Sequence, residues 1–82
     1  MKHKNMTVKD ILRTMEKDEK VTILDSKTNE RLETSSTCSY LLGFEIVIID
    51  EEDERIRNML GCEVVKIKLN KTFGDIELSI IW

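Results

Sequence analysis

The residue types that most often carry out chemistry are sparse in this chain. Its one histidine, His3, lies in a polar N-terminal stretch, whereas general acid–base catalysis most often depends on a positioned histidine. Serines and threonines are plentiful, but no neighbouring base that could activate a hydroxyl nucleophile is predicted. Gly43, Gly61 and Gly74 stand alone, so the chain has no Gly-rich loop of the kind that cradles a phosphate. We therefore predict a protein that is not an enzyme, with no catalytic residue and no cofactor.

The two cysteines do not predict a metal site. Cys38 and Cys62 belong to no spacing typical of zinc ligands. Small secreted scaffolds that depend on disulfides are usually much richer in cysteine. Two buried, reduced thiols are therefore the favoured interpretation, with a Cys38–Cys62 disulfide as the alternative.

An acidic run is the first candidate for a functional surface; it comprises Asp50, Glu51, Glu52, Asp53 and Glu54. The order of ligands that an EF-hand calcium loop requires is absent. A surface that imitates the phosphates of DNA and an acidic surface that binds a protein are both open interpretations. The favoured one is a solvated helix start, because acidic side chains in the first turn interact well with the helix dipole.

A basic strand near the end of the chain is the second candidate surface. Lys66, Lys68 and Lys71 would project from one strand face, where pairing with Glu77 and solubility explain them as well as a partner does. Ile81 and Val64 would point away from the core, so a helix or a second chain would have to cover them. The candidate interaction surface thus comprises the acidic run together with Lys66, Lys68 and Ile81.

The size and charge of the chain narrow its class. With 82 residues it is predicted to form a disordered tail over residues 1–5 and a single α+β domain over residues 6–82. The net charge of −3 disfavours sequence-independent binding of nucleic acid. No apolar run approaches the length of a membrane span, and the N-terminus does not read as a signal peptide. We expect a cytoplasmic protein without membrane contact.

The first half of the chain predicts a helix, a hairpin and a second helix. Apolar residues recur with helical spacing after Thr7, which is suited to be the N-cap, with Asp10 in the capping-box position. This helix should fade near residues 17–18. Strands over 21–24 and 31–34 would form the hairpin, and the hydroxyl cluster 34–37 would begin a helix that Gly43 ends.

The second half predicts a buried strand, a helix and a final hairpin. Residues 44–49 read as a central strand covered on both faces, and Asp50 would cap a helix that runs through Leu60. In the final hairpin, the odd positions of 65–69 and the even positions of 76–80 would form the buried face. Pairing of Lys68 with Glu77 would set Ile67 against Leu78 and Val65 against Ile80. Trp82 shares the parity of the buried positions and is expected to pack.

The predicted order of elements is therefore α-β-β-α-β-α-β-β. The fold class is α+β, with a small, mostly antiparallel sheet of four to five strands and two to three helices packed on it.

Two segments carry a resemblance to a group of known proteins. Residues 6–12 followed by residues 20–25, together with the style of the closing hairpin, resemble small phage- and prophage-encoded accessory proteins of Gram-positive bacteria, mostly of unknown function. The resemblance implies stoichiometric binding, in the manner of small phage inhibitors that block a host defence protein.

The leading hypothesis from the sequence is a non-catalytic protein-interaction module, with homodimerisation left open. The alternative is an oligomeric sponge or sensor that binds a small molecule between subunits.

Overall fold

A computed structural model describes residues 6–46 and 50–82 of the chain. Three helices and four strands follow one another in these residues; they are α1 (Val8–Leu12), β1 (Lys20–Asp25), β2 (Arg31–Thr37), α2 (Cys38–Gly43), α3 (Glu51–Leu60), β3 (Val64–Leu69) and β4 (Ile76–Ile80). The α+β class and the four-stranded sheet are as predicted.

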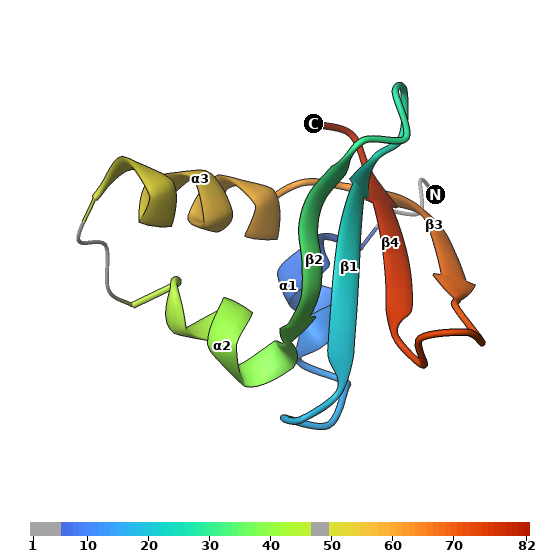
Figure 1. Ribbon diagram of the computed structural model, residues 1–82. Coiled ribbons are helices and arrows are strands. Elements are labelled where there is room, and N and C mark those ends of the chain that lie inside the picture. Colours follow the sequence, from blue (N-terminus) through green and yellow to red (C-terminus); the bar gives the residue numbers. More distant parts are fainter. Residues whose placement is uncertain (1–5, 47–49) are drawn as a thin grey trace, which may run out of the picture.

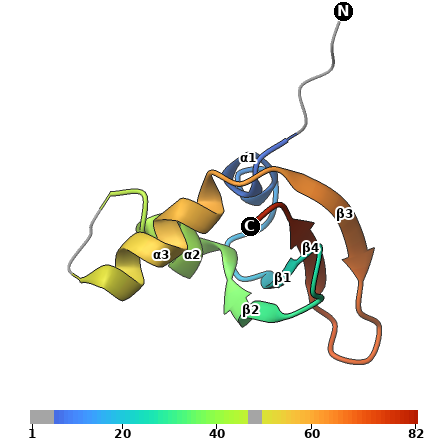
Figure 2. The ribbon, with the colours of Figure 1, turned by 90° about the horizontal axis from the view of Figure 1, so that it is seen from above.

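The strands form one curved sheet in the order β2-β1-β4-β3. The two hairpins, β1–β2 and β3–β4, are antiparallel, and the central strands β1 and β4 join them through a parallel pairing. The helices gather on one side of this sheet (Figures 1 and 2). This topology leaves β2 and β3 as the two edge strands.

The core lies between the helices and the inner face of the sheet. Alternate residues of the central strands point into it, such as Ile23 on β1 and Leu78 on β4. The helices contribute the other half; the buried residues there are Val8, Ile11, Leu12, Cys38, Leu41, Ile56, Met59 and Leu60. Burial of this apolar surface on both layers is the main stabilising contribution in so small a domain.

The start of α1 has the predicted capping box. The backbone N–H of Asp10 donates to Thr7 Oγ1 over 3.4 Å, and the backbone N–H of Thr7 donates to Asp10 Oδ2 over 3.1 Å. The helix is shorter than expected, since it ends at Leu12. Thr14 turns its hydroxyl back onto the carbonyl of Ile11, a local bond that competes with helix continuation.

The cap can be tested with Thr7→Ala. Loss of the capping hydroxyl should lower the free energy of unfolding by about 1 kcal/mol. Thermal and urea denaturation would measure this, with the exposed Thr72→Ala in the last turn as the control. A Thr7→Ala protein as stable as the wild type would show that the cap does not contribute.

The same box predicts an acid dependence. The bond from the backbone N–H of Thr7, followed by the Thr7 hydroxyl, lowers the pKa of Asp10 in the folded protein. A group with a lowered folded pKa stabilises the fold above its unfolded pKa, and that contribution disappears as the pH falls through the folded value. Asp10→Asn should therefore remove this part of the acid dependence.

The final hairpin confirms part of the predicted register and corrects the rest. Lys68 pairs with Glu77 and Ile67 with Leu78, as expected, but Ile80 pairs with Val64 instead of Val65. One extra residue, a β-bulge at Val65, shifts the register. As a result Val64 is buried against the core, contrary to the prediction, while Val65 is half-exposed.

Three other predictions need correction. Residues 44–46 form a turn instead of the start of a central strand, and Ile46 is 87% exposed; the remainder of that predicted strand, residues 47–49, lies outside the described residues. The whole hydroxyl cluster 34–37 belongs to β2, and its last residue, Thr37, is also the N-cap of α2. Trp82 is 45% exposed because β4 ends at Ile80, so strand alternation no longer directs it inward.

Candidate functional site

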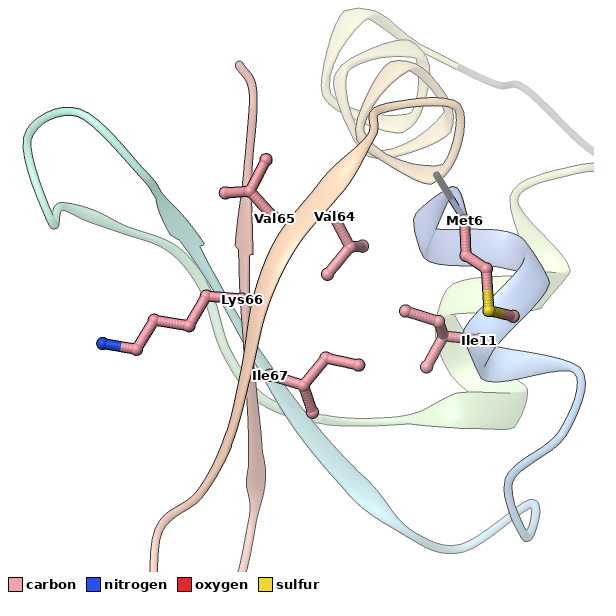
Figure 3. A pocket seen from close by; sticks show the side chains of 6 residues that line it. All are labelled: Met6, Ile11, Val64, Val65, Lys66 and Ile67. Atoms are coloured by element: carbon pink, nitrogen blue, oxygen red, sulfur yellow. The ribbon is translucent and has the colours of Figure 1, made fainter. Parts of the chain in front are cut away.

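An apolar groove opens between α1 and the edge strand β3. The side chains of Met6 and Ile11 face those of Val64 and Ile67 across it (Figure 3). The groove encloses about 320 Å³, and Val65 and Lys66 complete its lining from the strand. Ile67 is 58% exposed, because α1 is too short to cover this strand beyond its first residues. The groove therefore has room for an apolar side chain of a binding partner.

The start of β3 is held beside α1 by backbone bonds. The N–H of Val64 donates to the carbonyl of Met6 over 2.9 Å, and the N–H of Val8 donates to the carbonyl of Cys62 over 3.1 Å. Thr7 and Glu63 form an antiparallel bridge between these two bonds. The outer edge of β3 is thus occupied at Val64, and it becomes free only after the bulge.

The rest of the outer edge carries unused backbone groups. The N–H of Asn70 donates to the carbonyl of Asp75 over 2.9 Å, which makes that pair a bonded one. Along an antiparallel ladder, hydrogen-bonded residue pairs alternate with pairs that are not hydrogen-bonded. Counting back from Asn70, the backbone groups of Lys68 and Lys66 therefore bond to β4. The N–H and C=O groups of Ile67 and Leu69 consequently point away from β4, toward the free side of the sheet. No other described strand pairs with them.

The side chains of the two lysines of β3 point to the sheet face opposite the groove, although Lys66 borders the groove along the strand. Figure 3 shows Lys66 pointing away from Met6 and Ile11, and Lys68 follows it by one strand repeat. Neither lysine forms an ion pair with another described residue. Glu77, which lies across from Lys68, accepts a hydrogen bond from Asn70 Nδ2 over 3.1 Å instead. These ammonium groups are therefore exposed to solvent and available to an acidic partner.

The acidic run begins α3, as predicted. Asp50 is the N-cap and accepts from the backbone N–H of Asp53 over 3.1 Å, and Glu51, Glu52 and Glu54 are exposed in the first turn. This end of α3 lies on the far side of the molecule from β3 (Figure 1). The predicted acidic and basic residues therefore form two separate surfaces.

The remaining predicted residue, Ile81, follows β4 and is half-exposed. Its backbone N–H donates to the carbonyl of Glu63 over 3.0 Å. Next to it, Trp82 lies beside α3, with the guanidinium carbon of Arg55 at 5.9 Å from its ring centre. Arg55 also donates to the carbonyl of Leu32 over 3.0 Å, so it ties α3 to both β2 and the chain end.

A buried polar cluster on the outer sheet face was not predicted. Asp75 is 3% exposed, and its Oδ2 accepts bonds from the hydroxyls of Thr22 and Ser35. The backbone N–H of Ser35 donates to Thr22 Oγ1 over 3.1 Å, and Oδ1 of Asp75 is buried without a hydrogen-bond partner among the described residues.

Local backbone geometry explains this cluster. Ser35 has a φ of 49°, in a β2 bulge opposite Thr22 that brings its N–H and hydroxyl to the cluster. In the sequence Asp75 follows Gly74, so it resembles an ordinary exposed turn residue. A solute cannot reach its carboxylate from solvent, and the cluster is suited to joining β1, β2 and β4 more than to chemistry.

The cysteines are both free thiols. Cys38 is buried, and Cys62 is partly buried, with its thiol donating to the carbonyl of Asn58 over 3.3 Å. Burial raises the pKa of the Cys38 thiol, with a further contribution from the charge of Glu19, and burial also raises the pKa of the Cys62 thiol. A raised pKa lowers the thiolate fraction and thereby the nucleophilicity of both groups at neutral pH.

The described residues contain neither a metal-binding cluster nor a helix that could span a membrane. No group of three or more histidine, cysteine, aspartate or glutamate side chains is placed to hold a metal ion. Likewise, none of the helices in residues 6–46 and 50–82 has the length and apolar character needed to cross a membrane. Comparison of the chain with protein-family models, curated proteins and solved structures finds no match to any of them.

Proposed function

We propose that this protein is a non-catalytic interaction module that binds a protein partner at the groove between α1 and β3. The observation that supports this proposal is the exposure of Ile67 and Leu69, at 58% and 57%, on an edge strand beside that groove. A contiguous apolar patch on a small domain is typical of an interaction site, and an open strand edge is a template for pairing.

Binding, not turnover, fits the polar residues of the molecule. The carboxylate of Asp75 is buried with its hydroxyl partners, and the pKa of each free thiol is raised by burial. A module of this kind acts stoichiometrically, by covering a surface of its partner. The resemblance of residues 6–12 and 20–25 to phage and prophage accessory proteins supports a partner that is blocked by this contact.

The test is affinity purification from the native host with matched variants. Ile67→Glu places a charge in the groove, whereas Ile46→Glu places the same charge at a position that is 87% exposed, in the turn after α2. We expect a stoichiometric partner to be retained by the wild type and by Ile46→Glu, and to be lost by Ile67→Glu. Retention of the partner by all three proteins would contradict the proposed site.

A further variant separates the groove from the acidic surface. Reversal of Glu51, Glu52 and Glu54 to lysine changes the first turn of α3 without touching β3. If the groove is the binding site, this variant should retain the partner. Loss of the partner with this variant alone would move the interaction to α3.

A further inference from the structure

The free edge of β3 can accept another strand. Its bulge and its bridge to α1 occupy the edge only as far as Val64. From there to Leu69 the backbone is extended, which offers about 15 Å of open edge at the usual rise per strand residue. Because Ile67 and Leu69 direct their N–H and C=O groups to this side, an added strand would bond to these two residues.

The side chains of β3 define what such a strand would contain. Successive residues of a strand lie on opposite faces, so a strand paired with β3 has one set of side chains beside Ile67 and Leu69 and the other beside Lys66 and Lys68. The first set would meet the apolar groove, and the second would meet two ammonium groups without ion-pair partners among the described residues. Alternating apolar and acidic residues match both faces.

The strand already paired with β3 follows this pattern in part, with Ser79 instead of an acidic residue across from Lys66. On the opposite edge, β4 places Glu77 across from Lys68 and Leu78 across from Ile67. From these contacts, and on the basis of the proposed function, we infer that β3 binds an extended partner segment of alternating acidic and apolar residues as a fifth strand of the sheet. The acidic residues lie over Lys66 and Lys68, and an apolar residue enters the groove.

Charge argues against two other occupants. In a symmetric antiparallel β3–β3 pairing between copies, the register that sets Ile67 opposite Leu69 also sets Lys68 opposite Lys68, which is destabilising. A nucleic acid would be attracted only weakly to a chain of net charge −3, because few lysines are available to neutralise its phosphates. The side chains that line the groove are aliphatic, so they offer no ring on which a base could stack.

The experiment measures binding of short labelled peptides to the full chain by fluorescence anisotropy. The probe is Glu-Ile-Glu-Leu-Glu-Ile, with Lys-Ile-Lys-Leu-Lys-Ile as the charge control and Glu-Glu-Glu-Ile-Leu-Ile as the pattern control. We expect the alternating acidic peptide to bind at least about tenfold more tightly than either control, and to weaken as salt is added. Single-stranded DNA is a fourth probe, for which no comparable binding is expected.

Two variants locate the contact. The double variant Lys66→Glu/Lys68→Glu should reverse the preference, so that it binds the lysine peptide better than the acidic one. Ile67→Pro removes an N–H that the bonds to β4 do not use, so the fold should persist while peptide affinity falls about tenfold or more. Ile67→Val, which keeps the N–H, should stay within about twofold of the wild type. If Ile67→Pro does not fold, the reversal of charge preference decides.

Equal affinity for the acidic and lysine peptides, tighter binding of DNA, or unchanged preference in the charge-reversed variant would overturn the inference. Concentration-dependent dimerisation that competes with the peptide would overturn it as well, in favour of a second copy. These outcomes leave the proposed function standing if Ile67→Glu still loses the host partner. Retention of that partner by Ile67→Glu would instead remove the proposed function itself.

Discussion

Thr22→Val should lower the free energy of unfolding by about 3 kcal/mol, although valine has nearly the same shape as threonine. The Thr22 side chain is completely buried, and its hydroxyl accepts from the backbone N–H of Ser35 while it donates to the carboxylate of Asp75. Its removal leaves a buried N–H without an acceptor and a buried carboxylate with one donor fewer. Chemical denaturation of purified protein would measure the change.

Two further variants separate the hydroxyl from the packing around it. Thr22→Ser keeps the hydroxyl and loses a methyl group, for which we expect a loss of about 1 kcal/mol. In an Asp75→Asn background the cost of Thr22→Val should shrink, because the two side chains interact directly. A Thr22→Val protein within about 0.5 kcal/mol of the wild type would mean that this cluster contributes little.

Leu41→Ala should be similarly severe, at about 2–5 kcal/mol. Leu41 is fully buried in the core between α2 and the neighbouring elements, so alanine would leave a cavity that the thin core can fill only in part. Thermal denaturation and near-UV circular dichroism would report the loss of stability and of packing.

The adjacent residue is the matched control. Leu42 is on the same helix and has the same side chain, but it is only partly buried against the core. Leu42→Ala should therefore cost less than half as much as Leu41→Ala. Equal losses at both positions would contradict the placement of α2, since the two side chains could then not differ in burial.

Much of the fold was predictable where local patterns and pairing agree. Thr7 and Asp50 cap their helices as their sequence neighbours indicate, and the match of Lys68 with Glu77 predicted the register of the final hairpin correctly between the turn and the bulge. The alternation rule failed at Val65, because the extra residue of the bulge turns Val64, which precedes it, to the face predicted for Val65. No feature of the sequence marks that bulge.

The candidate site was only partly predictable. The sequence predicted that Lys66 and Lys68 belong to an interaction surface, and both residues are exposed. It also assigned Ile67 to a buried face, although the helix that would have to cover it ends at Leu12. Helix length decides how far a sheet face is covered. After Leu12 the backbone N–H groups of Thr14 and Met15 bond to carbonyls three residues back, a change that apolar periodicity does not report.

Amide hydrogen exchange at single residues tests the partner-binding edge most directly. In the free protein the amides of Lys66 and Lys68 should be protected by β4, whereas those of Ile67 and Leu69 should exchange rapidly. Addition of the alternating acidic peptide should slow exchange at Ile67 and Leu69 and leave the acidic turn of α3 unchanged. Bound peptide with no added protection at Ile67 and Leu69 would show that β3 does not receive a fifth strand.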